Sequence, residues 1–433
     1  MFRNPRPVFF LLLVGLLVLF AASSVIAQDA PITITFWKHS HPPADTFSEE
    51  IIREYEEQNP NVNIEIEIIP SDQYINRVLT AAAGGQLPDL FDINDANHAI
   101  LVANGVLAPL DPTSFGFEDQ AGLESAYVPG SLDPFKGTDG KIYGMPFEYN
   151  SWVMVINDQI FREAGLDPET DYPRTWSEVG EIGARLAQVE NGVFQRQGFA
   201  WNLVTPGWTM LLYSPLVYQL GGSILTEDDL GNECALNSEA GVTALQTMKD
   251  MYYTYNAGAP GINLSTAQSA MVDYTEERIG MWILGPWAVP ILTADEDVID
   301  DIRIIPLPQM DNAERQVVML SSWVWVVNGA SERAQEAWRF VNYAQEQGDR
   351  WLASSGYILP RLGWQEAESA QEFPGLDVFI DQMQYGRPRL IHPRAGEIAT
   401  IIHQAVQNAV LNNADAQATL DAACEEINFV LSS

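Results

Sequence analysis

Residues 144–157 read GMPFEYNSWVMVIN, an apolar run that carries one acid, Glu148, and the polar residues Tyr149 and Asn150. An apolar run of this length is typical of a buried strand. Pro146 restricts the strand to a sheet edge or to a strand start, because proline has no backbone N–H to donate. The stretch therefore predicts a strand that crosses between two bodies, in which the carboxylate of Glu148 requires a partner or a ligand.

The length and composition predict a globular protein of two lobes or domains. A chain of 433 residues exceeds one ordinary core, and 47% apolar with 18% charged residues is a globular balance. The formal net charge of −36 makes nucleic acid and anionic lipid poor partners. The acidic runs at 226–233 and 293–301 do not match the spacing of a calcium loop, so we expect solvated loops there.

The N-terminal segment has the features of a signal peptide. Arg3 and Arg6 precede an apolar run at 8–22, and small residues lead to Ala27. We expect residues 1–27 to be a signal peptide that is cleaved after export across the cytoplasmic membrane. An uncleaved anchor is the alternative, although the apolar run is short for a membrane span. The leader has no cysteine, so a lipid-anchored N-terminus is not supported.

Two cysteines, Cys234 and Cys424, lie beyond the leader. An exported protein meets an oxidising compartment, where a disulfide between them can persist. Cys424 shares a helical face with Leu420 and Ile427, so a small buried core residue is the other interpretation. The sequence leaves both open, because a disulfide requires a geometry that sequence does not supply.

Strand and helix patterns alternate along the first part of the chain. Residues 31–37, PITITFW, predict a strand, and residues 62–68 alternate apolar and polar positions as a strand with one exposed face does. Between them, a capping box at Thr46 predicts the start of a helix, and a second capping box follows at Thr175. Asp95 is expected to cap another helix. This alternation predicts an α/β fold with a parallel or mixed sheet.

Ligands of such sheets bind at the carboxyl ends of the strands, where Trp37, His39 and Asp95 are expected. His39 and His41 could form half of a metal site, but no other histidine lies at a supporting spacing. We therefore predict no metal and no cofactor. No nucleophile elbow, P-loop, zinc-protease or dinucleotide motif occurs, and carboxylates are too numerous to single out a glycosidase pair.

Tryptophan placement indicates a carbohydrate ligand. Trp37, Trp208 and Trp287 stand beside turn residues, and a flat indole face stacks well on a sugar ring. Trp323 begins a strand in which it faces the same side as Trp325, and we assign Trp323 to the cleft. A buried core position is the alternative reading of any tryptophan, and helical periodicity favours it for Trp176, Trp338 and Trp351.

Seven stretches occur across the chain in one characteristic order: ITITFW, QNPNVNIEI, AAGGQLPDLFDINDANHAILVANGVLAPLDP, GKIYGMPFEYNSWVMVIN, RIGMWILGPWAV, SSWVWVVNGAS and GYILPR. Each one alone is weak, but their order is specific. With these stretches the chain resembles the extracytoplasmic solute-binding proteins of the sugar-binding group, which serve ATP-driven ABC importers and include the maltose-binding proteins.

The resemblance implies a two-lobed periplasmic-binding-protein-like fold of type II, whose discontinuous lobes are joined by a hinge. Lobe one is expected at 28–147 and 319–373, and lobe two at 148–318 and 374–433. Both cysteines then fall in lobe two, which favours their pairing. The resemblance further implies a periplasmic or extracellular bacterial protein, a monomer, whose partners are a small carbohydrate and the membrane permease subunits of an ABC transporter.

The resemblance also implies a ligand-binding set, to which we add Trp323 from its strand position and Arg394 as a basic candidate. Tyr149 is expected near the hinge, and Glu148 is expected to accept hydrogen bonds from sugar hydroxyls. The full expected ligand set is Trp37, His39, Asp95, Glu148, Asn150, Trp208, Trp287, Trp323 and Arg394.

The expected function is capture of a sugar or oligosaccharide by hinge closure, without catalysis. A secreted carbohydrate-active enzyme that uses Glu148 and Asp95 is one alternative. A binder of a non-sugar solute such as glycerol phosphate is another. That ligand would require a basic cluster in the cleft, for which only Lys38 and Arg394 are candidates.

Overall fold

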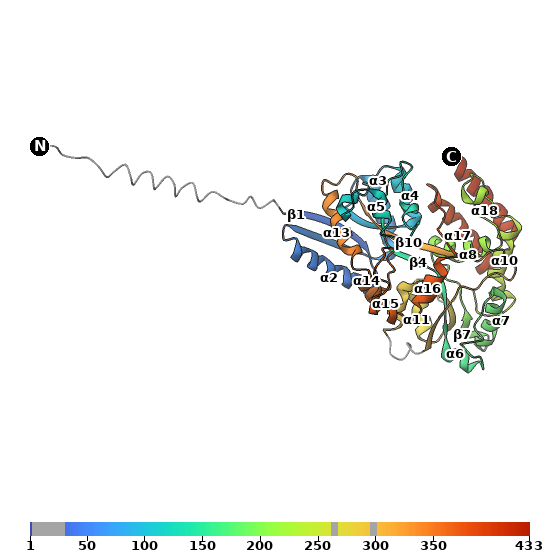
Figure 1. Ribbon diagram of the computed structural model, residues 1–433. Coiled ribbons are helices and arrows are strands. Elements are labelled where there is room, and N and C mark those ends of the chain that lie inside the picture. The colour runs from blue at the N-terminus through green and yellow to red at the C-terminus, as the bar shows by residue number, and fades with distance from the viewer. Residues whose placement is uncertain (2–30, 261–266, 295–300) are drawn as a thin grey trace.

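Two β-sheets, each covered by helices, form the two lobes of the protein (Figure 1). The structure is a computed structural model that describes Met1 and residues 31–260, 267–294 and 301–433. The expected signal peptide lies outside the described residues, apart from Met1. The mixed α/β architecture confirms the predicted fold class.

Lobe one is built on a six-stranded sheet. Its first strand pairs in parallel with the second and the third, while the tenth strand is antiparallel to the third and the fourth. The strands are β1 (Ile32–His39), β2 (Val62–Ile69), β3 (Leu90–Asn94), β4 (Met145–Ser151), β10 (Val318–Val327) and β11 (Gly386–Arg387). Its main helices are α2 (Pro42–Gln58), α3 (Ser71–Gly84), α4 (Asp95–Ala103), α5 (Gln120–Glu124), α13 (Ala334–Gln345) and α14 (Gly348–Ser355).

Lobe two is built on a five-stranded sheet. Its strands are β5 (Val153–Asn157), β6 (Gln188–Glu190), β7 (Val193–Phe199), β8 (Ile279–Leu284) and β9 (Ile302–Ile305). Its main helices are α6 (Asp158–Glu163), α7 (Trp176–Leu186), α8 (Pro206–Gln219), α10 (Glu239–Tyr253), α11 (Ala267–Thr275), α16 (Leu376–Met383), α17 (Ala395–Asn412) and α18 (Ala416–Ser432). Short turns of helix complete it at η3 (Pro286–Ala288), α9 (Thr226–Asp229), α12 (Val289–Leu292) and α15 (Glu368–Glu372).

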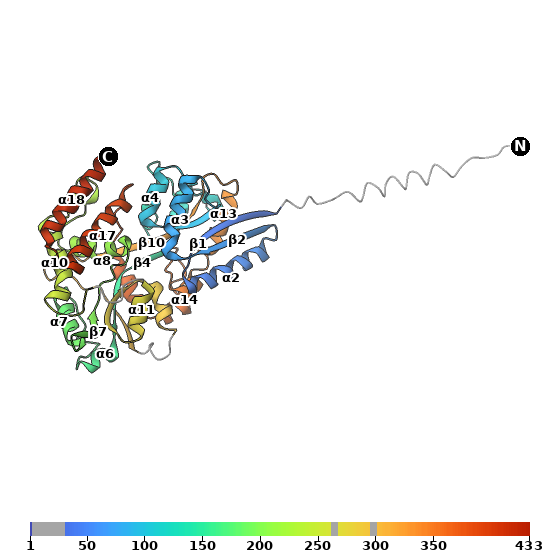
Figure 2. The same cartoon turned by 180° about the vertical axis from the view of Figure 1, so that it is seen from behind.

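The stretch at 144–157 passes from one sheet to the other. β4 ends at Ser151 in the sheet of lobe one, and β5 begins at Val153 in the sheet of lobe two. β10 crosses as well, because Val318 packs in the core of lobe two and Val327 in that of lobe one. Both strands lie between the lobes when the molecule is viewed from the front and from behind (Figure 1, Figure 2). These crossings join the lobes.

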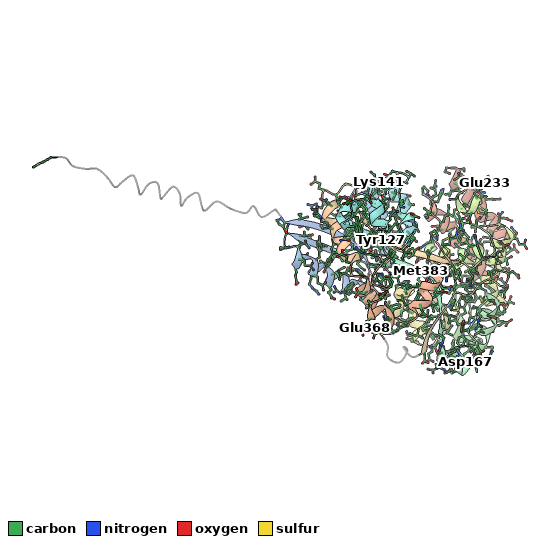
Figure 3. The ribbon with its side chains drawn as sticks, in the orientation of Figure 1. Tyr127, Lys141, Asp167, Glu233, Glu368 and Met383 are labelled. Atoms are coloured by element: carbon green, nitrogen blue, oxygen red, sulfur yellow. A yellow bond between two sulfur atoms is a disulfide. The ribbon has the colours of Figure 1, made fainter. Side chains whose placement is uncertain are left out.

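The third connection runs along residues 352–383. Leu352 lies in α14, the last main helix of lobe one, yet it packs in one apolar cluster with Trp364, Phe373 and β8 of lobe two. The chain then reaches α16, whose last residue, Met383, lies where the lobes meet, while Tyr127 lies in lobe one and Asp167 in lobe two (Figure 3). The expected lobe boundaries stay a prediction. The boundary expected at residue 373 is the one this segment concerns, because residues before 373 pack against β8 of lobe two.

Local signals explain several of the helix starts. Thr175 and Glu178 form the predicted capping box before α7. The predicted helix start at Thr46 is wrong, because α2 already begins at Pro42. A proline is tolerated in the first turn of a helix, where its missing N–H costs no hydrogen bond. The predicted cap at Asp95 is also wrong. Asn94 caps α4 by accepting from the N–H of Asn97, so Asp95 is the first helical residue.

Candidate functional site

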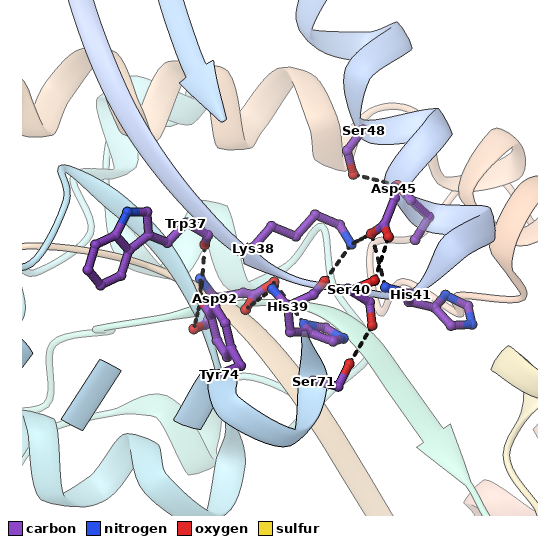
Figure 4. Close-up of polar contacts among 11 residues, drawn as sticks. Trp37, Lys38, His39, Ser40, His41, Asp45, Ser48, Ser71, Tyr74 and Asp92 are labelled. Carbon is purple, nitrogen blue, oxygen red and sulfur yellow. Dashed lines mark hydrogen bonds and ion pairs between the residues drawn. The ribbon is translucent and has the colours of Figure 1, made fainter. Parts of the chain in front are cut away.

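His39 and Asp92 meet where the parallel strands β1 and β3 end. The Nδ1 atom of His39 lies 2.9 Å from Oδ2 of Asp92, and the backbone N–H of His39 donates to both carboxylate oxygens at 3.2 and 3.3 Å. Tyr74 donates its hydroxyl to the carbonyl of Asp92 at 2.8 Å (Figure 4). The His39 ring stacks on Trp323 with 3.7 Å between ring centroids. The structure thus brings His39 and Trp323 together and fixes the imidazole by Asp92.

Trp37 lies apart from this group. Its ring points away from His39 and His41 (Figure 4). The guanidinium carbon of Arg77, on α3, lies 4.3 Å from the centroid of the Trp37 ring. Trp37 borders a surface depression with Glu67 and other residues of the β2–α3 region. Because α3 packs beside this end of β1, the indole is directed to the outer side of lobe one.

Glu148 and Asn150 form a buried polar pair on β4. Asn150 donates its Nδ2 to Oε1 of Glu148 at 2.5 Å, and the Oδ1 of Asn150 has no hydrogen-bond partner among the described residues. Burial raises the pKa of Glu148 to about 8, and the hydrogen bond from Asn150 and the charge of Arg389 oppose the shift only in part. At neutral pH this carboxyl therefore holds a proton, so it can donate one hydrogen bond as well as accept others.

Asp95 faces a cation that sequence reasoning did not select, Arg389. The Nε of Arg389 lies 3.0 Å from Oδ1 of Asp95, and Oδ2 of Asp95 accepts the backbone N–H of Ser322 at 3.0 Å. Burial raises the pKa of Asp95, and the charge of Arg389 opposes the increase. Arg394, the expected basic residue, instead pairs with Glu397 in the first turn of α17.

Lobe two contributes a cluster of aromatic side chains. Trp208 lies in the first turn of α8 and Trp287 in η3, directly after β8. Their ring centroids are 5.9 Å apart with the planes at 88°, and Trp152 packs against Trp208 at 4.8 Å. Both Trp208 and Trp287 remain partly exposed. They form an aromatic wall, a name that we keep for Trp208 and Trp287.

His41 connects lobe one to this aromatic wall. It follows β1, and its ring centroid lies 6.1 Å from that of Trp287 and 5.3 Å from that of Tyr357, on which it stacks. Burial lowers the pKa of His41 to about 3, with further lowering from the charges of His39 and Lys38. His41 is therefore neutral, and neither ring nitrogen makes a hydrogen bond of normal geometry with a described residue.

Some buried polar atoms that have no partner in the described parts of the chain lie near the region between the lobes, while others, such as Nε1 of Trp176 and Nε1 of Trp338, lie inside the lobe cores. Most buried polar groups of native proteins have hydrogen bonds, so each exception asks for an explanation. Among the described residues, hydrogen bonds of normal geometry are lacking for Oδ1 of Asn150, both ring nitrogens of His41 and the hydroxyl of Tyr357. Both side-chain amide atoms of Asn202 also lack hydrogen-bond partners within the described ranges. Asn202 follows β7, which is parallel to β8, so it lies at the same end of the sheet as Trp287, which follows β8. Hydroxyl groups of a bound ligand would satisfy such atoms.

Three other predicted residues, Tyr149, Cys234 and Cys424, have structural positions. Tyr149 donates its backbone N–H to the carbonyl of Ile358 at 2.8 Å, which links two of the segments that connect the lobes. Cys234 and Cys424 are joined by a disulfide with an S–S distance of 2.07 Å. The disulfide attaches α18 to the segment that follows α9 in lobe two.

The sequence-based predictions did not include three residues of this region: Asp92, Arg389 and Asn202. They also did not include a contact of His41 with Trp287. Asp92 had a usable signal, since an acid inside the apolar strand LFDIN must find a partner. Arg389 had none, because residues 388–394 form no helix or strand that would set its direction. Among the described residues, no group of three or more histidine, cysteine, aspartate or glutamate side chains is arranged to hold a metal ion.

Across the described parts of the chain, no helix combines the length and apolar character that crossing a bilayer requires.

Comparisons with known proteins agree with this architecture. The arabinooligosaccharide-binding protein of Bacillus subtilis is 23% identical over 385 residues, which cover 84% of this chain and 81% of that protein. The sn-glycerol-3-phosphate-binding periplasmic protein of Brucella abortus is 26% identical over 184 residues, 40% of each chain.

The fold also matches solved structures. An ABC transporter solute-binding protein of Thermotoga lettingae, bound with α-D-tagatose, superimposes with a TM-score of 0.81 at 21% identity, covering 92% of this chain and 100% of that one. Residues 39–350 match the family of bacterial extracellular solute-binding proteins, which is most of the chain. With the two sheets, the crossing strands and this match, the chain belongs to the bacterial extracellular solute-binding protein family.

Proposed function

We propose that the protein captures a sugar or oligosaccharide between its lobes and delivers it to the permease of an ABC transporter. One observation carries the proposal: the aromatic wall of Trp208 and Trp287 in lobe two lies beside buried polar atoms without partners, among them the ring nitrogens of His41 in lobe one. Indole faces suit the C–H faces of a sugar, and the polar atoms suit its hydroxyls. The names of the arabinooligosaccharide-binding and tagatose-bound relatives support the same ligand class.

The charge of the site favours a ligand without a phosphate. Asp92 and Asp95 lie near Glu148, which holds a proton at neutral pH, and Arg389 is already paired with Asp95. Lys38, the other basic candidate, is paired with Asp45 at 2.7 Å. An anion would have to displace one of these acids from its cation, which costs binding free energy. A glycerol phosphate ligand, suggested by one partial relative, is therefore the weaker candidate.

Binding proceeds in this proposal by hinge closure. The segments near Tyr149, β10 and Ile358 connect the lobes, so small backbone changes there can turn one lobe against the other. Contacts from both lobes to the ligand exist only in the closed form, and the ligand shifts the equilibrium by that difference in affinity. No bond is made or broken. An enzyme that uses Glu148 and Asp95 would instead release reducing sugar from a glycoside, which a turnover assay detects.

We propose that the protein acts as a monomer in the periplasm or outside the cell, without nucleic acid as a partner. The family to which it belongs supports an extracytoplasmic location, and the acidic net charge of −36 supports the absence of nucleic acid.

A sugar panel tests the ligand class. We expect at least one sugar to raise the unfolding temperature of the protein without residues 1–27, because a ligand at 100 times its dissociation constant adds about 2.7 kcal/mol to the free energy of unfolding. Differential scanning fluorimetry with pentoses, hexoses, disaccharides and longer oligosaccharides measures the shift. If sn-glycerol 3-phosphate shifts the midpoint and no sugar does, the proposed ligand class is wrong.

Replacement of Trp287 by alanine tests the aromatic wall. Loss of one stacking indole is expected to weaken the binding of the sugar found in the panel by about 2 kcal/mol, roughly 30-fold. Isothermal titration calorimetry measures the dissociation constant, and circular dichroism checks the fold. Tyr172→Ala, which removes another partly buried aromatic side chain of lobe two, is the matched control. Unchanged sugar affinity in Trp287→Ala would remove Trp287 from the site.

A further inference from the structure

Asp95 and Arg389 form an ion pair that runs from one lobe to the other. Asp95 is the first residue of α4, at the end of β3 in lobe one. Arg389 follows β11, and the next residue, Leu390, packs in the core of lobe two together with α8 and α17. The Nε of Arg389 lies 3.0 Å from Oδ1 of Asp95, and the two side chains are only 10% and 13% exposed. The lobes are thus in direct contact here through buried charges.

The surroundings place this ion pair beside the aromatic wall. A Cβ atom built on Gly207 would lie 3.2 Å from Nη1 of Arg389, so the guanidinium lies over the first turn of α8, next to Trp208. A Cβ built on Gly396 would lie 3.7 Å from the side-chain oxygen of Asn97, so α17 and α4 also approach each other on this side. The region bounded by Trp208 is therefore closed on this side by contact between the lobes.

The carboxylate of Asp95 is held independently of Arg389. Its Oδ2 accepts the backbone N–H of Ser322 at 3.0 Å, and its Oδ1 accepts the N–H of Ala96 at 2.8 Å. Ser322 precedes Trp323, the residue that stacks on His39. The ion pair is consequently anchored to the same strand that carries one aromatic residue of the site, and its position relative to that residue is defined.

We propose that Asp95 and Arg389 form an end wall of the ligand site and restrict it to short saccharides. This inference rests on the proposed function. A terminal sugar ring can donate a hydroxyl to Asp95 and accept from the remaining N–H groups of Arg389. A longer chain that continued past this point would have to separate the pair while both charges stay largely buried, and that separation opposes binding. The affinity for the saccharide should therefore fall once the chain is too long to end at Asp95 and Arg389.

Two homologous series test the end wall: glucose, maltose, maltotriose and maltotetraose, and arabinose, arabinobiose, arabinotriose and arabinotetraose. In titration calorimetry of the mature protein, we expect the dissociation constant to rise at least tenfold from the best short member to the tetrasaccharide of its series. The double variant Asp95→Asn with Arg389→Gln removes both charges and leaves no unpaired buried ion. In this variant the dissociation constant of the tetrasaccharide, divided by that of the best short member, should be at least fivefold smaller than in the wild type.

A second double variant provides the control. Glu336→Gln with Arg339→Gln removes a surface ion pair of α13, whose charged atoms are 2.9 Å apart, and should leave the length preference unchanged. The end wall is overturned if wild-type affinity keeps increasing up to the tetrasaccharide, or if the Asp95 and Arg389 variant retains the wild-type ratio. Absence of binding by every sugar of any length would contradict the proposed function itself, which is a separate outcome.

Discussion

Removal of the disulfide between Cys234 and Cys424 is expected to lower the free energy of unfolding of the protein by about 4 kcal/mol. The two cysteines are 190 residues apart, and a cross-link that closes so long a loop removes much conformational entropy from the unfolded chain. Because the bond attaches α18 to the segment after α9, its loss should also let the C-terminal helix separate first. Urea unfolding of the Cys234→Ala, Cys424→Ala double variant measures the difference.

Alanine is the appropriate replacement at Cys424, which is 4% exposed in the core of lobe two, because serine would bury a hydroxyl there. Reduction of the wild-type protein with dithiothreitol should reproduce the loss, and the double variant should not respond to the reductant. Asn428→Ala is a matched control, since it removes only the hydrogen bond from the N–H of Cys234 that joins the same two segments at 2.7 Å. A double variant as stable as the wild type would show that the disulfide is dispensable.

Much of the fold could be predicted because it depends on local patterns. The alternation in β2 and the capping box at Thr175 each depend on a few neighbouring residues. The residue that caps α4 could not be predicted from local sequence alone. Asn94 and Asp95 are both good caps, and the choice between them follows from distant groups, Ser322 and Arg389, that bind the carboxylate of Asp95.

For the candidate site, the sequence indicated which residue types to expect, but not which of the predicted side chains lie close together. Trp208, Trp287 and His39 stand at element ends, where ligand-facing residues are common. The structure places Trp208 against Trp287, which contacts His41 of lobe one, and places His39 against Trp323. Trp37 has the same local signal, yet α3 and Arg77 cover it, a contact between distant residues. Arg389 and Arg394 are five positions apart without strand or helix periodicity between them, so only the tertiary structure shows which one meets Asp95.

The second large effect concerns Glu148 and pH. Its pKa is 4.5 in the reference state and about 8 in the folded protein, because burial disfavours the charged carboxylate. Below pH 4.5 both states hold the proton, and its contribution to stability is complete. Between pH 4.5 and about 8 only the folded state holds it, so stability falls by about 1.4 kcal/mol per pH unit. Above about pH 8 the contribution is lost.

Glu148→Gln removes this titration and keeps an amide that can donate to a neighbour. We expect the wild-type free energy of unfolding minus that of the variant to decrease steadily between pH 4.5 and 8, measured by urea unfolding at half-unit steps. His41 acts in the opposite direction, since its pKa of about 3 in the fold makes the unfolded chain bind the extra proton between pH 3 and 6.5. Both proteins contain His41, so its contribution cancels in the difference.

The matched control is Glu57→Gln, which removes one exposed carboxylate from α2 and so reports the effect of a changed net charge alone. If the difference for Glu148→Gln is as independent of pH as that of the control, Glu148 is ionised in the folded protein at neutral pH. The carboxylate would then only accept hydrogen bonds, as its position in the crossing strand first indicates. A decreasing difference instead makes Glu148 a hydrogen-bond donor, whose proton an acceptor oxygen of a bound sugar could receive.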